Sequence, residues 1–80
     1  MYVITFHQMT DALMMEKLGK AIEPDFRLIP VPRQISSSCG LAAQTSLDLK
    51  TIEELIATNK IDADGIYEKD GHNYTVIKEH

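Results

Sequence analysis

Residues 28–42 read LIPVPRQISSSCGLA, and this stretch decides how the rest of the chain can be arranged. It contains two of the three prolines, three consecutive serines and the only cysteine. A proline has no backbone N–H to give to a neighbouring strand, so a strand that contains Pro30 and is followed by Pro32 belongs at the edge of a sheet. A small polar loop then leads to Cys39 and Gly40. The stretch therefore predicts an edge strand followed by a loop that carries the only thiol.

Length and composition are typical of one small globular domain. The 80 residues are 44% hydrophobic and 25% charged, which argues against wholesale disorder. We expect a single domain over residues 1–80, with a core over residues 2–69 and a hairpin strand over residues 70–80. Eight basic and twelve acidic residues give a net charge of −4, with no basic stripe. This balance argues against nucleic acid and anionic membranes as partners.

The single cysteine also limits the cellular compartment and the kinds of covalent or metal site that the chain can form. One cysteine cannot form an internal disulfide, and the apolar runs are too short for a membrane span. No signal peptide is expected, because the first residues already read as a strand. The sequence therefore predicts a cytoplasmic protein. One cysteine and three scattered histidines do not suffice for a structural zinc site, and we expect no cofactor.

The N-terminal third predicts a strand and a helix. Residues 2–6 are β-branched and aromatic, as in a strand. Thr10 is a good N-cap for a helix that ends at residues 23–25. The apolar stripe of this helix is expected to contain Met14, Leu18, Ala21 and Ile22, flanked by Leu13 and Met15.

The remaining chain predicts three further strands after the edge strand, and a second helix. The edge strand is expected over residues 26–31, and a strand of small residues over 40–45. Ser46 or Asp48 would cap the second helix, and Asn59 would end it in a left-handed conformation. Its apolar positions are Leu49, Ile52, Leu55 and Ile56. Strands over residues 65–69 and 74–77 would be joined at Asp70-Gly71, a strong two-residue hairpin signal.

This order of elements predicts an α+β fold. A β-α-β-β-α-β chain with right-handed crossovers forms the split βαβ, ferredoxin-like arrangement, with an antiparallel sheet in the order 4-1-3-2. That order puts the second strand at an edge, as its prolines require, and the C-terminal hairpin extends the sheet. An open α/β sheet is the alternative, but two short helices and a hairpin between the second and third strands suit it poorly.

The topology places the candidate reactive residues at one end of the sheet. The first and second strands end there, so His7, the helix N-terminus at Thr10 and the loop with Cys39 should lie together. A helix N-terminus and nearby cations such as His7 or Arg33 favour the thiolate form of a cysteine. In this loop, Ser36, Ser37 and Ser38 offer hydroxyl donors to an anionic sulfur, and Gly40 would let the backbone approach closely.

Each of these residues also has a plainer interpretation. A lone cysteine is commonly a small buried hydrophobe. His7 suits a strand end that bonds to backbone, Arg33 suits a solvated loop, and the serines suit a flexible connection. The residues by themselves predict a candidate reactive thiol but no particular reaction.

Several motifs of the chain match a known family. They are the opening YVITFH, then TDAL with EK a turn later, then RLIPVPR, the loop S-x-x-C-G-L-A, and GIYE. With these motifs, spaced over residues 2–68, the chain resembles the selenium/sulfur carrier-like proteins. Residues 70–80 fall outside the resemblance.

The resemblance implies a carrier of selenium or sulfur metabolism rather than a turnover enzyme. Cys39 would hold a persulfide or perselenide, taken from a cysteine desulfurase-type donor and passed to an acceptor protein. A dithiol oxidoreductase would need a second cysteine. The alternatives are a ligand-sensing, adaptor or dimerisation module, in which Cys39 would be buried or dispensable. If a homodimer forms by extension of the sheet, the last strand is the expected interface, because that strand lacks proline.

Overall fold

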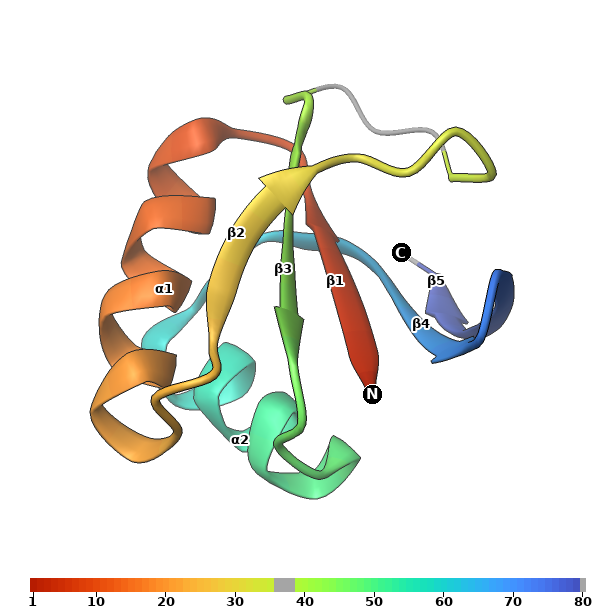
Figure 1. Cartoon of the computed structure of the whole chain (residues 1–80). Coiled ribbons are helices and arrows are strands. Elements are labelled where there is room, and N and C mark those ends of the chain that lie inside the picture. The colour runs from red at the N-terminus through yellow and green to blue at the C-terminus, as the bar shows by residue number, and fades with distance from the viewer. Residues whose placement is uncertain (36–38, 80) are drawn as a thin grey trace.

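The elements follow one another along the chain in the order β-α-β-β-α-β-β (Figure 1). A computed structural model describes residues 1–35 and 39–79. The elements are β1 (Tyr2–Phe6), α1 (Met9–Ile22), β2 (Arg27–Pro30), β3 (Leu41–Thr45), α2 (Leu49–Asn59), β4 (Ala63–Asp70) and β5 (Asn73–Glu79).

The five strands form one antiparallel sheet in the order β2-β3-β1-β4-β5, and two helices complete an α+β fold. The sequence predicts the order 4-1-3-2 for four strands. The observed order, 2-3-1-4-5, differs from that four-strand order by including β5, the strand expected to extend the sheet, outside β4. β2 and β5 are therefore the two edges. The edge position predicted for β2 is confirmed, and Pro30 pairs there with Leu41 of β3.

The last two strands are longer than the sequence predicts. β4 begins two residues earlier, at Ala63, and β5 continues to Glu79. Asp70 pairs with Asn73, so Gly71 and His72 form the two-residue loop. Gly71 has a φ of 62°, which is why the turn needs glycine at this position. The predicted hairpin is confirmed.

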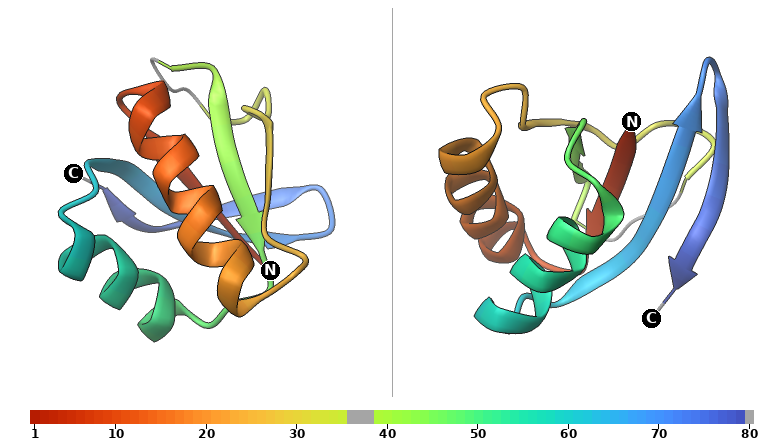
Figure 2. Two further views of the ribbon diagram at one scale, coloured as in Figure 1. Left: turned by 90° about the vertical axis from the view of Figure 1, so that its left-hand side faces the viewer. Right: turned by 90° about the horizontal axis from the view of Figure 1, so that it is seen from below.

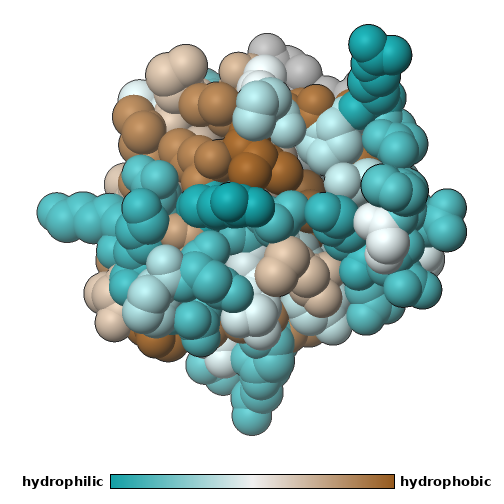
Figure 3. Space-filling model, viewed as in Figure 1, coloured by the Kyte–Doolittle hydropathy of each residue, from teal (hydrophilic) through white to brown (hydrophobic). Residues whose placement is uncertain are grey.

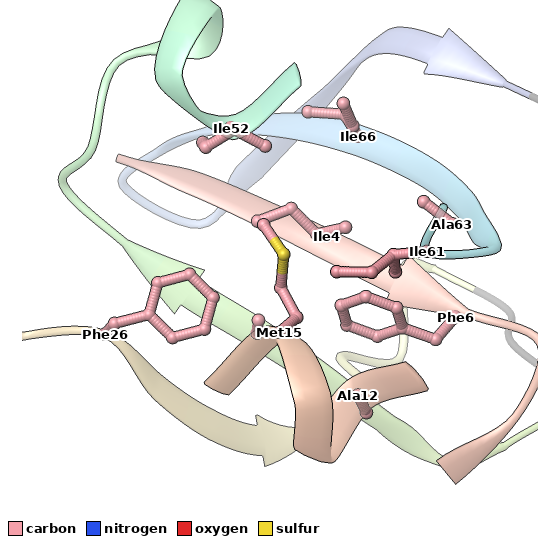
Figure 4. Packing of buried hydrophobic residues seen from close by; sticks show 10 residues of the cluster. Ile4, Phe6, Ala12, Met15, Phe26, Ile52, Ile61, Ala63 and Ile66 are labelled. Atoms are coloured by element: carbon pink, nitrogen blue, oxygen red, sulfur yellow. The ribbon is translucent and has the colours of Figure 1, made fainter. Parts of the chain in front are cut away.

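Both helices pack on one face of the sheet (Figure 2), and the main core lies between these layers. Figure 4 shows Met15 of α1 pointing in between the rings of Phe26 and Phe6 and toward Ile4. The buried cluster contains Ile4, Phe6, Ala12, Met15, Phe26, Ala43, Ile52, Ile61, Ala63 and Ile66.

The buried face of α1 differs from the predicted stripe. The buried residues are Ala12, Met15 and Gly19, whereas Met14 and Ile22 are about half exposed. Leu13 and Ala21 are exposed as well. The reason is close packing, because a Cβ built at Gly19 would overlap the Phe26 ring. Ala12 and Gly19 let α1 approach the sheet closely, and Met15 is the one large side chain on its buried face.

The ends of α2 confirm one expectation and correct another. Asp48 is the N-cap, and its Oδ1 accepts a hydrogen bond from Thr51 N at 3.1 Å. The left-handed residue at the C-terminus is Lys60, with a φ of 53°, and not Asn59. Asn59 stays within the helix, where its side-chain amide donates to Leu55 O at 2.9 Å.

Candidate functional site

Cys39 lies at the end of the sheet where β1 and β2 end and β3 begins (Figure 1). Pairing of Thr5 with Ala42 and of Pro30 with Leu41 sets this position. The N-terminus of α1 lies at the same end. In the space-filling view, apolar surface gathers over the end of β2 and the start of α1 (Figure 3).

The thiol of Cys39 is half-buried and has a defined local geometry. Its Sγ lies 3.2 Å from Leu41 O, to which the thiol donates, and 3.4 Å from Leu41 N, which donates to the sulfur. The side chain packs against the main core cluster. A backbone N–H aimed at the sulfur is a donor suited to an anionic sulfur.

Gly40 is required by its backbone conformation. Its φ is 76°, in the left-handed region. Among the described residues, nothing lies within 4 Å of a Cβ built at this position. Gly40 therefore occupies a turn conformation that only glycine adopts easily.

The loop between β2 and β3 is closed at its base. Val31 N donates to Gly40 O at 3.2 Å, and Ile35 N donates to Pro32 O at 3.0 Å in a turn. Arg33 is exposed within this turn. The candidate donors Ser36, Ser37 and Ser38 lie outside the described residues.

His7 directs its imidazole toward two carboxylates that the sequence did not single out. Its Nε2 lies 3.5 Å from Asp64 Oδ1 and 4.0 Å from Asp62 Oδ1. These charges offset the positive charge of a protonated His7. The available signal was the alternation Asp62-Ala63-Asp64, in which buried Ala63 turns both carboxylates to the other side.

Thr10 is not the N-cap of α1, which corrects the prediction. The cap is Gln8, in an extended conformation and without a side-chain cap bond. Ala12 N already donates to Gln8 O at 3.3 Å, so the helical hydrogen bonds begin two residues earlier than predicted. Thr10 is therefore an exposed residue of the first turn.

A cleft of about 310 Å³ lies near the opposite end of the sheet, away from Cys39. The residues around it are Met1, Lys20, Pro24, Asp25, Arg27 and Gln44. Hydrogen bonds from the Ser46 hydroxyl, the Ser46 N–H and the Thr45 hydroxyl hold the pKa of Asp25 below its usual value, and the positive charge of Arg27 acts in the same direction. This carboxylate ties the start of β2 to the end of β3.

Over residues 1–35 and 39–79, no group of three or more His, Cys, Asp and Glu side chains is placed to hold a metal ion. Within the same ranges, neither helix has the length and apolar character needed to cross a membrane.

Comparison with known proteins identifies a family. A family model described as "Putative Se/S carrier protein-like" matches residues 1–68. The match covers 68 of the 80 residues, includes Cys39, and stops before β5. No curated protein and no solved structure matches the chain. Because the match extends over most of its length, the chain belongs to the Putative Se/S carrier protein-like family.

Proposed function

We propose that this protein carries sulfur or selenium on Cys39 and passes it to an acceptor protein. The observation that carries the proposal is the place of the only cysteine. It sits half-buried on a turn at the end of the sheet, within the family match. We take the core to be the split βαβ, ferredoxin-like unit, which presents this turn.

The transfer conserves sulfur oxidation states and needs no cofactor. The Cys39 thiolate attacks the outer sulfur of a cysteine persulfide on a desulfurase-type donor. A new S–S bond forms at Cys39, the donor S–S bond breaks, and the donor cysteine leaves as a thiolate. An acceptor thiolate then attacks the outer sulfur on Cys39. A new S–S bond forms on the acceptor, the S–S bond at Cys39 breaks, and Cys39 leaves as a thiolate. The same balance holds with selenium as the transferred atom.

The local geometry supports a single exchangeable thiolate. When the thiol loses its proton, Leu41 O loses a donor while Leu41 N continues to donate to the sulfur. The site has no second cysteine that could displace the bound atom as an internal disulfide. In this proposal His7 and Arg33 modulate the charge near the thiolate and do not supply the reacting atom.

The test is loading measured by intact mass. The pure protein is incubated with a cysteine desulfurase and cysteine, and separately with a selenium donor. We expect one added sulfur or selenium atom, which a reductant removes because the bond is exchangeable. Cys39→Ser should abolish loading. His7→Ala and Arg33→Ala should slow loading without preventing it.

Cys39→Ser is also a control for folding. A serine hydroxyl can keep the two hydrogen bonds to Leu41, so circular dichroism and the melting temperature should stay close to those of the parent. If no donor adds mass while Cys39 is freely alkylated, the carrier function is wrong. A ligand-sensing, adaptor or dimerisation module, for which Cys39 is dispensable, would then be the better assignment.

A further inference from the structure

The face of the sheet opposite the helices is partly covered by Ile35, which lies between β2 and Cys39 in the sequence. Ile35 is only 5% exposed and forms a second buried cluster with Val3 of β1 and Ala42 of β3. Tyr67 of β4 and Tyr74 of β5 are partly buried against this cluster. Ile35 therefore packs on the sheet as part of an apolar cluster to which the central and the C-terminal strands both contribute.

A hydrogen bond joins the loop between β2 and β3 to the tip of the C-terminal hairpin. Gln34 Nε2 donates to His72 O at 3.2 Å, between residues 38 apart in the sequence. In Figure 1 the loop after β2 extends toward the side of the molecule where β4 and β5 lie. The hairpin tip thus provides a fixed acceptor for an otherwise exposed side chain.

These contacts limit where Cys39 can lie. Ile35 precedes Cys39 by four residues, and an extended chain of that length spans roughly 13–14 Å at most. On the other side of Cys39, the bond from Val31 N to Gly40 O closes the loop base. A thiol held between two fixed points samples fewer positions than one on a free loop.

We infer that the hairpin of β4 and β5 anchors the loop between β2 and β3 at Gln34 and Ile35. Gln34, Ile35 and Tyr74 are then positioning residues for Cys39. The importance of this anchor for transfer rests on the proposed carrier function, but its effect on the thiol does not. The family match ends at residue 68, so β5 and the hairpin loop lie beyond the matched part of the chain.

The test measures access to Cys39 in the full chain. Gln34→Ala removes the donor to His72 O, and Tyr74→Ala removes a ring that packs against the buried cluster containing Ile35. We expect each variant to be alkylated by iodoacetamide about two- to tenfold faster at one pH, the range that one net hydrogen bond is worth. Amide exchange at Ile35 should rise by a similar factor. Tyr74→Phe, which keeps the ring, should behave as the parent.

Two controls separate positioning from general stability. Thr75→Ala changes the next residue of β5, which is exposed and points to the other face. Ile52→Val lowers the stability of the main core without touching the loop. Both should leave alkylation of the native protein unchanged.

The inference is overturned if folded Gln34→Ala and Tyr74→Ala are alkylated at the parental rate. It is equally overturned if Ile52→Val speeds alkylation as much as they do, because access would then follow global unfolding. Gln34 is exposed, so its variant keeps the test available if Tyr74→Ala does not fold. Neither readout uses sulfur loading, so failure of the carrier function would leave this result standing.

Discussion

The turns at the two ends of β3 are each held by a single side chain. At the start, Cys39 Sγ exchanges hydrogen bonds with the backbone of Leu41. At the end, Asp25 accepts from Thr45 Oγ1 at 3.1 Å and from Ser46 N at 3.2 Å. The hydrogen bonds of Cys39 are local to its own turn, whereas those of Asp25 join segments that are about 20 residues apart.

Asp25→Asn should lower the melting temperature at neutral pH. The folded protein holds the pKa of Asp25 below its usual value, chiefly through the Ser46 hydroxyl and also through Ser46 N–H and Thr45. Its stabilising effect is therefore complete above about pH 4 and is lost as the pH falls through the lowered pKa. Melting curves of variant and parent should differ at about pH 7, and the difference should be smaller at about pH 2.

Glu54→Gln is the matched control for this prediction. It removes an exposed carboxylate of α2 and should leave the melting temperature nearly unchanged at both values. If the difference in melting temperature between Asp25→Asn and the parent stays constant down to about pH 2, the ionised carboxylate is not the stabilising species.

At the scale of elements, the close packing of α1 on the sheet depends on the absence of a side chain at one position of its buried face. Gly19 contributes no side chain, and the ring of Phe26 occupies the space that a Cβ would take. Phe26 itself is fully buried in the main core. Helix propensity favours alanine over glycine by about 1 kcal/mol, so steric packing outweighs local preference here.

Gly19→Ala should destabilise the protein by about 1–3 kcal/mol, in spite of the better helix propensity of alanine, because the new methyl group overlaps Phe26. Urea unfolding of variant and parent measures this difference. Ala21→Gly, at an exposed position of the same helix, should cost about 1 kcal/mol from propensity alone. A Gly19→Ala protein more stable than the parent would mean that the ring moves aside without cost.

At the scale of the whole molecule, the two edges of the sheet differ. Pro30 lies in β2, where it withholds one backbone donor from any added strand. β5 has no proline, and its Val76 and Ile77 side chains are 50% and 39% exposed. An edge with free backbone groups and exposed apolar residues favours pairing with a second strand.

We propose that a homodimer forms through β5. The parent should sediment as a dimer, and the double variant Val76→Lys with Ile77→Lys should sediment as a monomer because like charges would meet across the seam. Deletion of residues 70–80 should also give a monomer. The lysine variant leaves Tyr74 and the hairpin tip in place, so it separates dimer formation from loop anchoring. Persistence of a dimer in both variants would place the seam elsewhere.

Much of the architecture could be predicted from the residues because it depends on near neighbours. The prolines of residues 28–42 forced β2 to an edge, Asp70-Gly71 marked the hairpin, and Asp48 capped α2. Helix boundaries were less well predicted. Gln8 begins α1 without a side-chain bond, so no local signal marks that start.

The candidate site was predicted only in its location. Strand directions and the single cysteine were enough to bring Cys39, His7 and the start of α1 to one end of the sheet. The partners of His7 were not predicted, because Asp62 and Asp64 come from the start of β4, which lies beside β1 only after folding.

By itself, the sequence determined the element types, the edge strand and the presence of one thiol on a polar loop, since these follow from backbone chemistry and short-range periodicity. Tertiary structure alone decided that Gly19 faces Phe26, and that Gln34 reaches His72 O. The physical reason is that such contacts depend on shape and register between segments far apart in the chain. Neither quantity is encoded in the spacing of neighbouring residues.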